Sequence, residues 1–280
     1  MTEPPKKKRK LPPLDASFSA PPRRTDSPDL HQGRTRTAPH VQGQWATHIY
    51  LELEPSPAFR KRLLSAVDLA RSSAPRDSTI HSLLDPPSLP SSRSSTPTLD
   101  TDAASTSEEA LHLSLSRPLM LQTNQRGELR AGVARVAKEV AGFSAQYATF
   151  AVLENDEKTR RFLGIEVGPG YDQLRALLTK LDAVLADLRL PTYYAEPRFH
   201  TSLAWSSTTS TSATSSTAPC ASPSAREEAA PPPLPFSNPT LEALEAKHGK
   251  ALRAEEFWAG EVCVKIGKDV ARFALSGRAS

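Results

Sequence analysis

Apolar and polar residues alternate in several short stretches of the chain, which predicts β-strands. In residues 46–53, Ile49, Leu51 and Leu53 share one face, and the residues between them occupy the other. Successive side chains of a strand point to opposite faces, so this spacing suits a strand that packs one face on a core. The same period recurs in residues 111–117, 145–153, 161–167, 199–205, 261–266 and 270–275.

A longer period of three to four residues predicts helices. Residues 57–70 begin with proline, which suits the first turn of a helix, and continue with apolar residues at helical spacing. Residues 172–188 carry leucines at Leu174, Leu178, Leu181, Leu185 and Leu188, which form one amphipathic stripe. Weaker stripes predict helices around residues 133–140 and over 241–253.

The order of these elements predicts an α+β fold with mixed antiparallel strands. Residues 145–153 and 161–167 are separated only by a turn, as are 261–266 and 270–275, and each pair therefore predicts a hairpin. A doubly wound parallel sheet would instead separate most strands by one helix each.

Three stretches lack any such period and predict disorder. Residues 1–40 are rich in proline and charge, and residues 72–105 are rich in Ser, Pro, Thr and Asp. In residues 206–236, Ser, Thr, Ala and Pro supply 25 of the 31 residues. Such segments bury too little apolar surface to offset the entropy of ordering them. We therefore expect a tail over 1–40 and one domain over 41–280, interrupted by insertions at 72–105 and 206–236.

The positive charge of the chain is concentrated in the tail. The formal net charge is +4, but residues 1–40 hold nine Lys or Arg and only four acidic residues. The tail includes a run of five cations after two prolines, Lys6, Lys7, Lys8, Arg9 and Lys10. Such a run predicts a nuclear localisation signal bound by importin, with a nonspecific RNA-binding arm as the alternative.

Other features of the sequence narrow the class of protein. No run of about eighteen apolar residues is present, so we expect no membrane span. The charged, proline-rich beginning does not resemble a secretory signal. The two cysteines, Cys220 and Cys263, are too few for a disulfide framework or a four-cysteine zinc site. We therefore expect a soluble intracellular protein.

Two His-x-Ser tripeptides are the candidate chemistry. His112 and Ser114 lie in one predicted strand, and His200 and Ser202 lie in another. Residues two apart in a strand project from the same face, so each strand presents an imidazole beside a hydroxyl. None of the other five histidines has Ser or Thr two residues later. For this reason His48, on the predicted strand 46–53, is expected to be structural.

Paired imidazoles and hydroxyls suit cleavage of a phosphoester without a metal. One imidazole acts as base while the other acts as acid, because the group titrates near neutral pH. The two hydroxyls hold the non-bridging oxygens of a pentacovalent phosphate. From spacing and alternation alone, two ordinary histidines on strands are an equally good interpretation.

Longer blocks around these residues resemble a known family. They are GQWATHIY, LHLSLS, NDEKTR, FLGIEV and YYAEPRFHTSLAW, at residues 43–50, 111–116, 155–160, 162–167 and 193–205. In content and order they are similar to the U6 small nuclear RNA phosphodiesterases of the two-histidine (2H) phosphoesterase superfamily. The resemblance implies two pseudo-symmetric lobes of antiparallel sheet with flanking helices and a central cleft.

The resemblance also implies roles for individual residues. His112 would be the general base, His200 the general acid, and Ser114 and Ser202 the phosphate-binding hydroxyls. Tyr194 would stack on the terminal base of the RNA. Arg198, Phe199 and Thr201 match the stretch that lines the nucleotide pocket. The family often has glutamine where this chain has Asp156, and a carboxylate there can accept but not donate to a uracil edge.

The function implied by the resemblance is a metal-independent 3′→5′ exoribonuclease in the nucleus, without a cofactor. It would trim the oligouridine tail of U6 RNA by attack of a ribose 2′-hydroxyl, in the maturation of this RNA for splicing. We expect a monomer whose partner is a single-stranded RNA 3′ end. Two alternatives stay open: a 2′,3′-cyclic phosphodiesterase or RNA-repair enzyme of the same superfamily, and a non-catalytic RNA-binding spliceosomal adaptor.

Overall fold

The computed structural model describes residues 41–84, 110–208 and 234–277, which belong to one compact unit, Val41–Ser280. The strands are β1 (Gln44–Leu53), β2 (Ile80–Ser82), β3 (Leu111–Ser114), β4 (Leu119–Gln122), β5 (Phe143–Glu154), β6 (Arg160–Val167), β7 (His200–Ser207), β8 (Glu256–Ala259), β9 (Glu261–Ile266) and β10 (Asp269–Ala274). The helices are α1 (Pro57–Ser72), α2 (Gln125–Glu139), α3 (Tyr171–Asp187), α4 (Asn238–Leu244) and α5 (Lys250–Arg253), with a π-helical turn η3 (Glu245–Gly249) between the last two.

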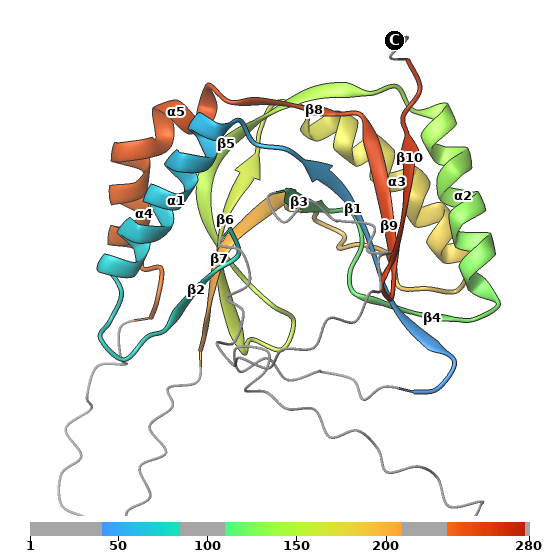
Figure 1. Cartoon of the computed structure of the whole chain (residues 1–280), viewed down its shortest axis with the longest axis horizontal. Helices are drawn as coiled ribbons and strands as arrows, with labels where there is room; N and C mark the ends of the chain where they lie inside the picture. Colours follow the sequence, from blue (N-terminus) through green and yellow to red (C-terminus); the bar gives the residue numbers. More distant parts are fainter. Residues whose placement is uncertain (1–40, 85–109, 209–233, 278–280) are drawn as a thin grey trace, which may run out of the picture. The chain divides into compact units, whose positions relative to one another are not determined.

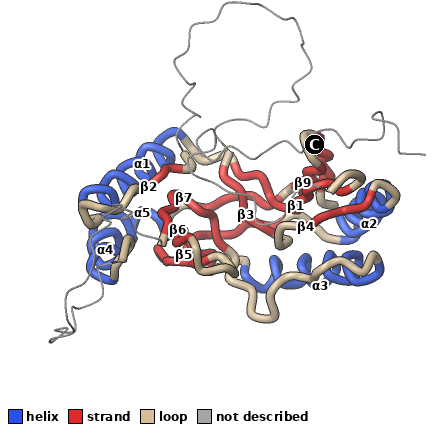
Figure 2. Tube along the Cα trace, turned by 90° about the horizontal axis from the view of Figure 1, so that it is seen from below, coloured by secondary structure: helices blue, strands red, loops and turns tan. Residues whose placement is uncertain are grey.

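All ten strands join one antiparallel sheet. Its order is β10-β9-β1-β3-β7-β6-β5-β8, with β4 paired to β1 and β2 paired to β7. Helices α1, α4 and α5 lie at one end of the sheet and α2 and α3 at the other (Figure 1). Strands β3 and β7 run between these two groups of helices (Figure 2). The predicted α+β fold of antiparallel sheet with flanking helices is confirmed, and the two lobes are halves of one sheet.

Local sequence explains where the main helices begin. The Ser56 hydroxyl accepts from the backbone N–H of Phe59 at 3.2 Å and caps α1, whose first helical residue is a proline. Helix α3 follows Gly170, which has a φ of 94°. A Cβ on Gly170 would lie 2.4 Å from the Cβ of Ala145 in β5, so glycine lets α3 start against the sheet.

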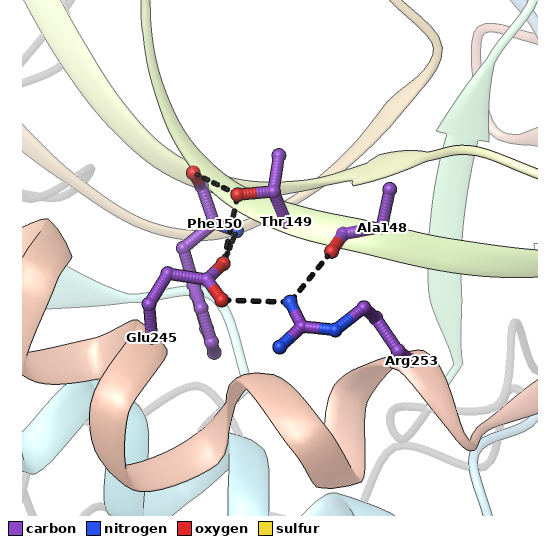
Figure 3. A network of polar contacts seen from close by, with 5 residues as sticks. All are labelled: Ala148, Thr149, Phe150, Glu245 and Arg253. Carbon is purple, nitrogen blue, oxygen red and sulfur yellow. Dashed lines mark hydrogen bonds and ion pairs between the residues drawn. The ribbon is translucent and has the colours of Figure 1, made fainter.

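A carboxylate ties the α4–η3–α5 segment to an irregular point in β5 (Figure 3). The register of β5 against β6 shifts between Tyr147 and Thr149. Glu245 accepts there from the Thr149 hydroxyl at 2.7 Å and from the backbone N–H of Phe150 at 2.9 Å. Arg253 donates to Glu245 at 2.8 Å and to the Ala148 carbonyl at 3.2 Å. These bonds satisfy backbone groups that a bulge removes from the ladder.

The structure corrects the edges of both predicted insertions. Helix α1 continues to Ser72, and β2 pairs with β7 inside the stretch 72–105 that was predicted to be disordered. In the second stretch, β7 continues to Ser207, and Phe236 is buried in the core. Pairing and burial against distant segments override the polar local composition here. Residues 85–109, which include the rest of the first predicted insertion, and residues 209–233 of the second lie outside the described residues.

Candidate active site

The two His-x-Ser segments lie side by side where the halves of the sheet meet. Strands β3 and β7 are joined by the antiparallel pair Leu113 and Thr201, and both of these side chains are 0% exposed. Their neighbours in each strand therefore project from the opposite face. The alternation inferred from the sequence is thus present on both strands.

The register of this pair sets the arrangement of the four polar side chains. An antiparallel ladder that pairs Leu113 with Thr201 places His112 beside Ser202 and Ser114 beside His200. The two histidines then occupy one diagonal, with about 7–8 Å between their positions on the backbone. The two serines occupy the other diagonal. A phosphate over the centre of this square would have an imidazole on each side and a hydroxyl at each remaining corner.

His200 is held by its own backbone and by β6. Its Nδ1 lies 2.6 Å from the carbonyl oxygen of Arg198, so Nδ1 carries the hydrogen and Nε2 is left for chemistry. Burial lowers the pKa of His200, while the Arg198 carbonyl and the Glu166 carboxylate oppose this shift. Glu166 is paired with His200 across the ladder and accepts from Nε of Arg198 at 2.6 Å.

His112 has different surroundings, which come from β1, β9 and β10. Its ring packs against Tyr50, with 4.3 Å between the ring centroids. Burial lowers the pKa of His112, and Glu52, its partner across the ladder, acts in the opposite direction. The same carboxylate accepts from Nη2 of Arg272 at 2.6 Å.

A third histidine belongs to this cluster. His48 in β1 lies with its Nε2 3.1 Å from the hydroxyl of Ser114, and its ring stacks on Tyr50 at 5.2 Å. Burial lowers its pKa to about 4, and His112 and Lys265 act in the same direction. No hydroxyl lies two residues after His48 in the sequence, but in the fold Ser114 of the neighbouring strand β3 places one beside it.

Tyr194 and Asp156 form a second group with Arg117. Tyr194 is 42% exposed, and its hydroxyl donates to one oxygen of Asp156 at 3.0 Å. Arg117 donates to the other oxygen at 2.5 Å, and its guanidinium lies over the tyrosine ring. Both oxygens of Asp156 are therefore engaged within the protein. Arg117, which directly follows the block 111–116, was missed in the sequence because nothing local relates it to Tyr194.

The chain can be placed by comparison with known proteins. The model of the family HVSL, described as an uncharacterised conserved protein, matches residues 12–274, well over half of the chain. The chain belongs to the HVSL family. The predicted resemblance to U6 small nuclear RNA phosphodiesterases is also confirmed, because curated proteins of that name are similar to it.

Two of these relatives and one solved structure define the similarity. U6 snRNA phosphodiesterase 1 of Mus musculus is 31% identical over 203 residues, which are 70% of this chain and 64% of the relative. The protein of that name from Rattus norvegicus is 31% identical over 183 residues, or 64% and 57% of the two chains. The HVSL chain thus spans less than two thirds of these relatives. Usb1 of Kluyveromyces marxianus is 14% identical, with a TM-score of 0.49 over 82% of this chain and 98% of that chain.

Some residues that the sequence assigned to the site have buried side chains in this HVSL chain. Phe199 and Thr201 were predicted to line the nucleotide pocket, but their side chains are 1% and 0% exposed. Phe199 packs against Tyr193, and the Thr201 hydroxyl lies 3.5 Å from that of Tyr147. Strand alternation turns both side chains into the core, and a place for these two residues in the nucleotide pocket stays a prediction. Arg198 is exposed, as a pocket residue would be.

The remaining expectations concern the tail, metals and membranes. The basic run Lys6 to Lys10 lies outside the described residues. Across the three described ranges, no group of three or more His, Cys, Asp or Glu side chains is arranged to hold a metal ion. Within the same ranges, no helix combines the length and apolarity needed to cross a membrane.

Proposed function

We propose that this chain is an RNA phosphodiesterase that shortens U6 small nuclear RNA from its 3′ end. The observation that carries the proposal is the square formed by His112, Ser114, His200 and Ser202 across the Leu113–Thr201 pair. The curated relatives named U6 snRNA phosphodiesterase 1 support the choice of substrate.

The reaction is a transesterification within the RNA. His112 takes the proton of the 2′-hydroxyl on the penultimate ribose, and the 2′-oxygen attacks the adjacent phosphorus. The bond from phosphorus to the 5′-oxygen of the terminal nucleoside breaks, and His200 protonates that oxygen. The shortened RNA ends in a 2′,3′-cyclic phosphate, which water can open to a 3′-phosphate. Ser114 and Ser202 donate to the non-bridging oxygens as negative charge develops on them.

Base recognition in this proposal relies on Tyr194. Stacking on an aromatic ring suits a single-stranded end and accepts any base. Asp156 holds Tyr194 through its hydroxyl and is itself neutralised by Arg117, so it supports the ring rather than reading a uracil edge. We therefore expect only a weak preference for uridine at the base that stacks on Tyr194. Arg198 would lie beside the same nucleotide.

The wider biological assignment belongs to the same proposal. We place the enzyme in the nucleus, as a monomer, with residues 1–40 as a tail that importin binds through Lys6 to Lys10. Its role would be the maturation of U6 RNA for pre-mRNA splicing. What supports this part is the name of the relatives and the isolated run of cations.

The test compares two short RNAs that end in several uridines, incubated with purified protein and EDTA. One is all ribose and the other has a 2′-deoxy penultimate nucleotide. We expect mass spectrometry to show shortened products with a cyclic phosphate or 3′-phosphate from the first RNA only. His112→Ala and His200→Ala should abolish the products, whereas His248→Ala, in the distant η3 turn, should retain them.

Each other outcome contradicts the proposal. Equal trimming of both RNAs would rule out attack by the 2′-hydroxyl, and loss of trimming in EDTA would rule out a metal-free reaction. Cleavage of 2′,3′-cyclic nucleotides without any shortening of RNA would indicate the cyclic phosphodiesterase. Tight RNA binding that persists without cleavage in the wild type would indicate the adaptor.

A further inference from the structure

His48 is the third imidazole of the site, and its contact is to a hydroxyl rather than to another histidine. In β1, Tyr50 lies opposite Ser114, and His48 precedes Tyr50 by two residues on the same face. Its Nε2 is 3.1 Å from the Ser114 hydroxyl oxygen, a normal hydrogen-bond distance. Stacking on Tyr50 fixes the plane of the His48 ring.

The direction of this hydrogen bond decides what Ser114 can do. A serine hydroxyl has one hydrogen to donate and can accept as well. If His48 accepted that hydrogen, Ser114 would present only lone pairs to a phosphate oxygen. If Nε2 of His48 carries the hydrogen and donates it, the Ser114 hydrogen is free to point at the phosphate.

We propose that His48 is a positioning residue that donates from Nε2 to the Ser114 hydroxyl and thereby directs the Ser114 hydrogen toward a non-bridging phosphate oxygen. This inference rests on the proposed function, since it assigns Ser114 to the phosphate. His48 itself does not touch the reacting atoms.

The surroundings of His48 keep it suited to this role. Burial holds its pKa well below the ordinary value, so the ring is neutral and carries a single N–H. Lys265 lies directly opposite His48 on β9, and its charge acts in the same direction. A neutral His48 does not exchange protons in the reaction, which leaves acid and base chemistry to His112 and His200.

Ser202 provides a natural comparison. It faces Gly164 of β6, which has no side chain to offer a donor. Among the described residues, no hydrogen bond to the Ser202 hydroxyl is found. The positioning is therefore specific to one of the two serines, and a test can compare them.

The test is a pair of double-mutant cycles on RNA cleavage. We expect His48→Phe to lower kcat by about tenfold, the loss that goes with one hydrogen bond, with little change in KM. His48→Gln, which retains an N–H donor at a similar reach, should recover most of this loss. In a Ser114→Ala background, His48→Phe should have no further effect, whereas its effect should persist in full in a Ser202→Ala background.

A structural role for His48 predicts a different pattern. Equal further losses in both serine backgrounds, or a His48→Gln variant as slow as His48→Phe, would overturn the proposal. If His48→Phe does not fold, His48→Asn replaces it in both cycles, since its shorter amide cannot reach Ser114.

An independent readout separates this inference from the proposed function. Nitrogen-15 NMR of histidine-labelled wild type and Ser114→Ala reports the tautomer of His48 without any RNA. We expect an Nε2–H tautomer whose signals shift in Ser114→Ala, and an Nδ1–H tautomer would overturn the role of His48. If the wild type leaves RNA uncut, the proposed function fails and the catalytic role of His48 fails with it, whichever tautomer is found.

Discussion

The guanidinium of Arg117 lies over the ring of Tyr194, with its central carbon 4.6 Å from the ring centroid. Arg117 follows β3 and Tyr194 precedes β7, and both bind Asp156. The cation covers one face of the ring, and the shared carboxylate holds the tyrosine hydroxyl. In the proposed function, a stacked base would therefore use the other face.

Variants of Tyr194 should separate stacking from positioning. Tyr194→Ala removes the ring, and we expect KM for oligouridine RNA to rise about tenfold, as for loss of one stacked base. Tyr194→Phe keeps the ring and loses only the bond to Asp156, so KM should rise by about threefold or less. Steady-state kinetics would check both, with kcat nearly constant. Equal effects of the two variants would contradict a stacking role.

The dependence of cleavage on pH should reflect the buried histidines. Burial lowers the pKa of both His112 and His200 from the ordinary 6.5. The acid must be protonated in the free enzyme, and a lowered pKa means that this form is lost at a lower pH. We expect kcat/KM to be highest below pH 6.5 and to fall as pH rises to 8. A maximum above pH 7.5 at constant ionic strength would contradict this account.

Stability should also depend on pH through His48. Its pKa is lowered from 6.5 to about 4 in the folded protein, so the unfolded chain binds the proton more readily between these values. The stabilisation is complete above pH 6.5 and is lost as pH falls toward 4. It amounts to on the order of 3 kcal/mol for a shift of this size. Urea unfolding between pH 5 and 7 would show the slope, which should be smaller in His48→Gln.

The Glu245 network should stabilise the fold without contributing to the chemistry. Glu245→Ala leaves the Phe150 N–H without its acceptor. It also removes the shorter of two contacts made by the Thr149 hydroxyl, whose other contact is to the Phe150 carbonyl oxygen at 3.2 Å. We expect the free energy of unfolding to fall by about 2 kcal/mol, the cost of partly buried groups left unsatisfied. Glu242→Ala, on the exposed side of α4, is the control and should change it by less than about 0.5 kcal/mol. A large loss of kcat in folded Glu245→Ala would contradict this separation.

The sequence predicted those features that depend on local period. The strand alternation placed His112, Ser114, His200 and Ser202 on one face of each strand, and the leucine stripe of α3 marked its buried side. Strands β2, β4 and β8 were missed because each has only three or four residues and, unlike the equally short β3, none lies in a longer alternating run.

The contacts that complete the site could not be read from local pattern. The bond from His48 to Ser114 spans 66 positions, and that from Arg117 to Asp156 spans 39. Each depends on the register of strands that are distant in the chain, and register is not encoded in the period of one strand. The burial of Thr201 was implied by the alternation itself, yet the family resemblance assigned it to the pocket.

In the proposed reaction, the pairing of Leu113 with Thr201 has a consequence for the direction, 5′ to 3′, in which the RNA lies across the site. A half-turn about an axis through Leu113 and Thr201, perpendicular to the sheet, exchanges His112 with His200 and Ser114 with Ser202. The backbone positions of these four residues therefore define no direction. An RNA strand bound in either orientation would have one histidine beside the attacking oxygen and the other beside the leaving oxygen. In the proposed reaction, the direction of shortening would therefore be set by residues outside the square, such as Tyr194 with Arg117 or Lys265 with Arg272. An enzyme of this design could reverse its polarity by changing its flanks while its catalytic residues stayed the same.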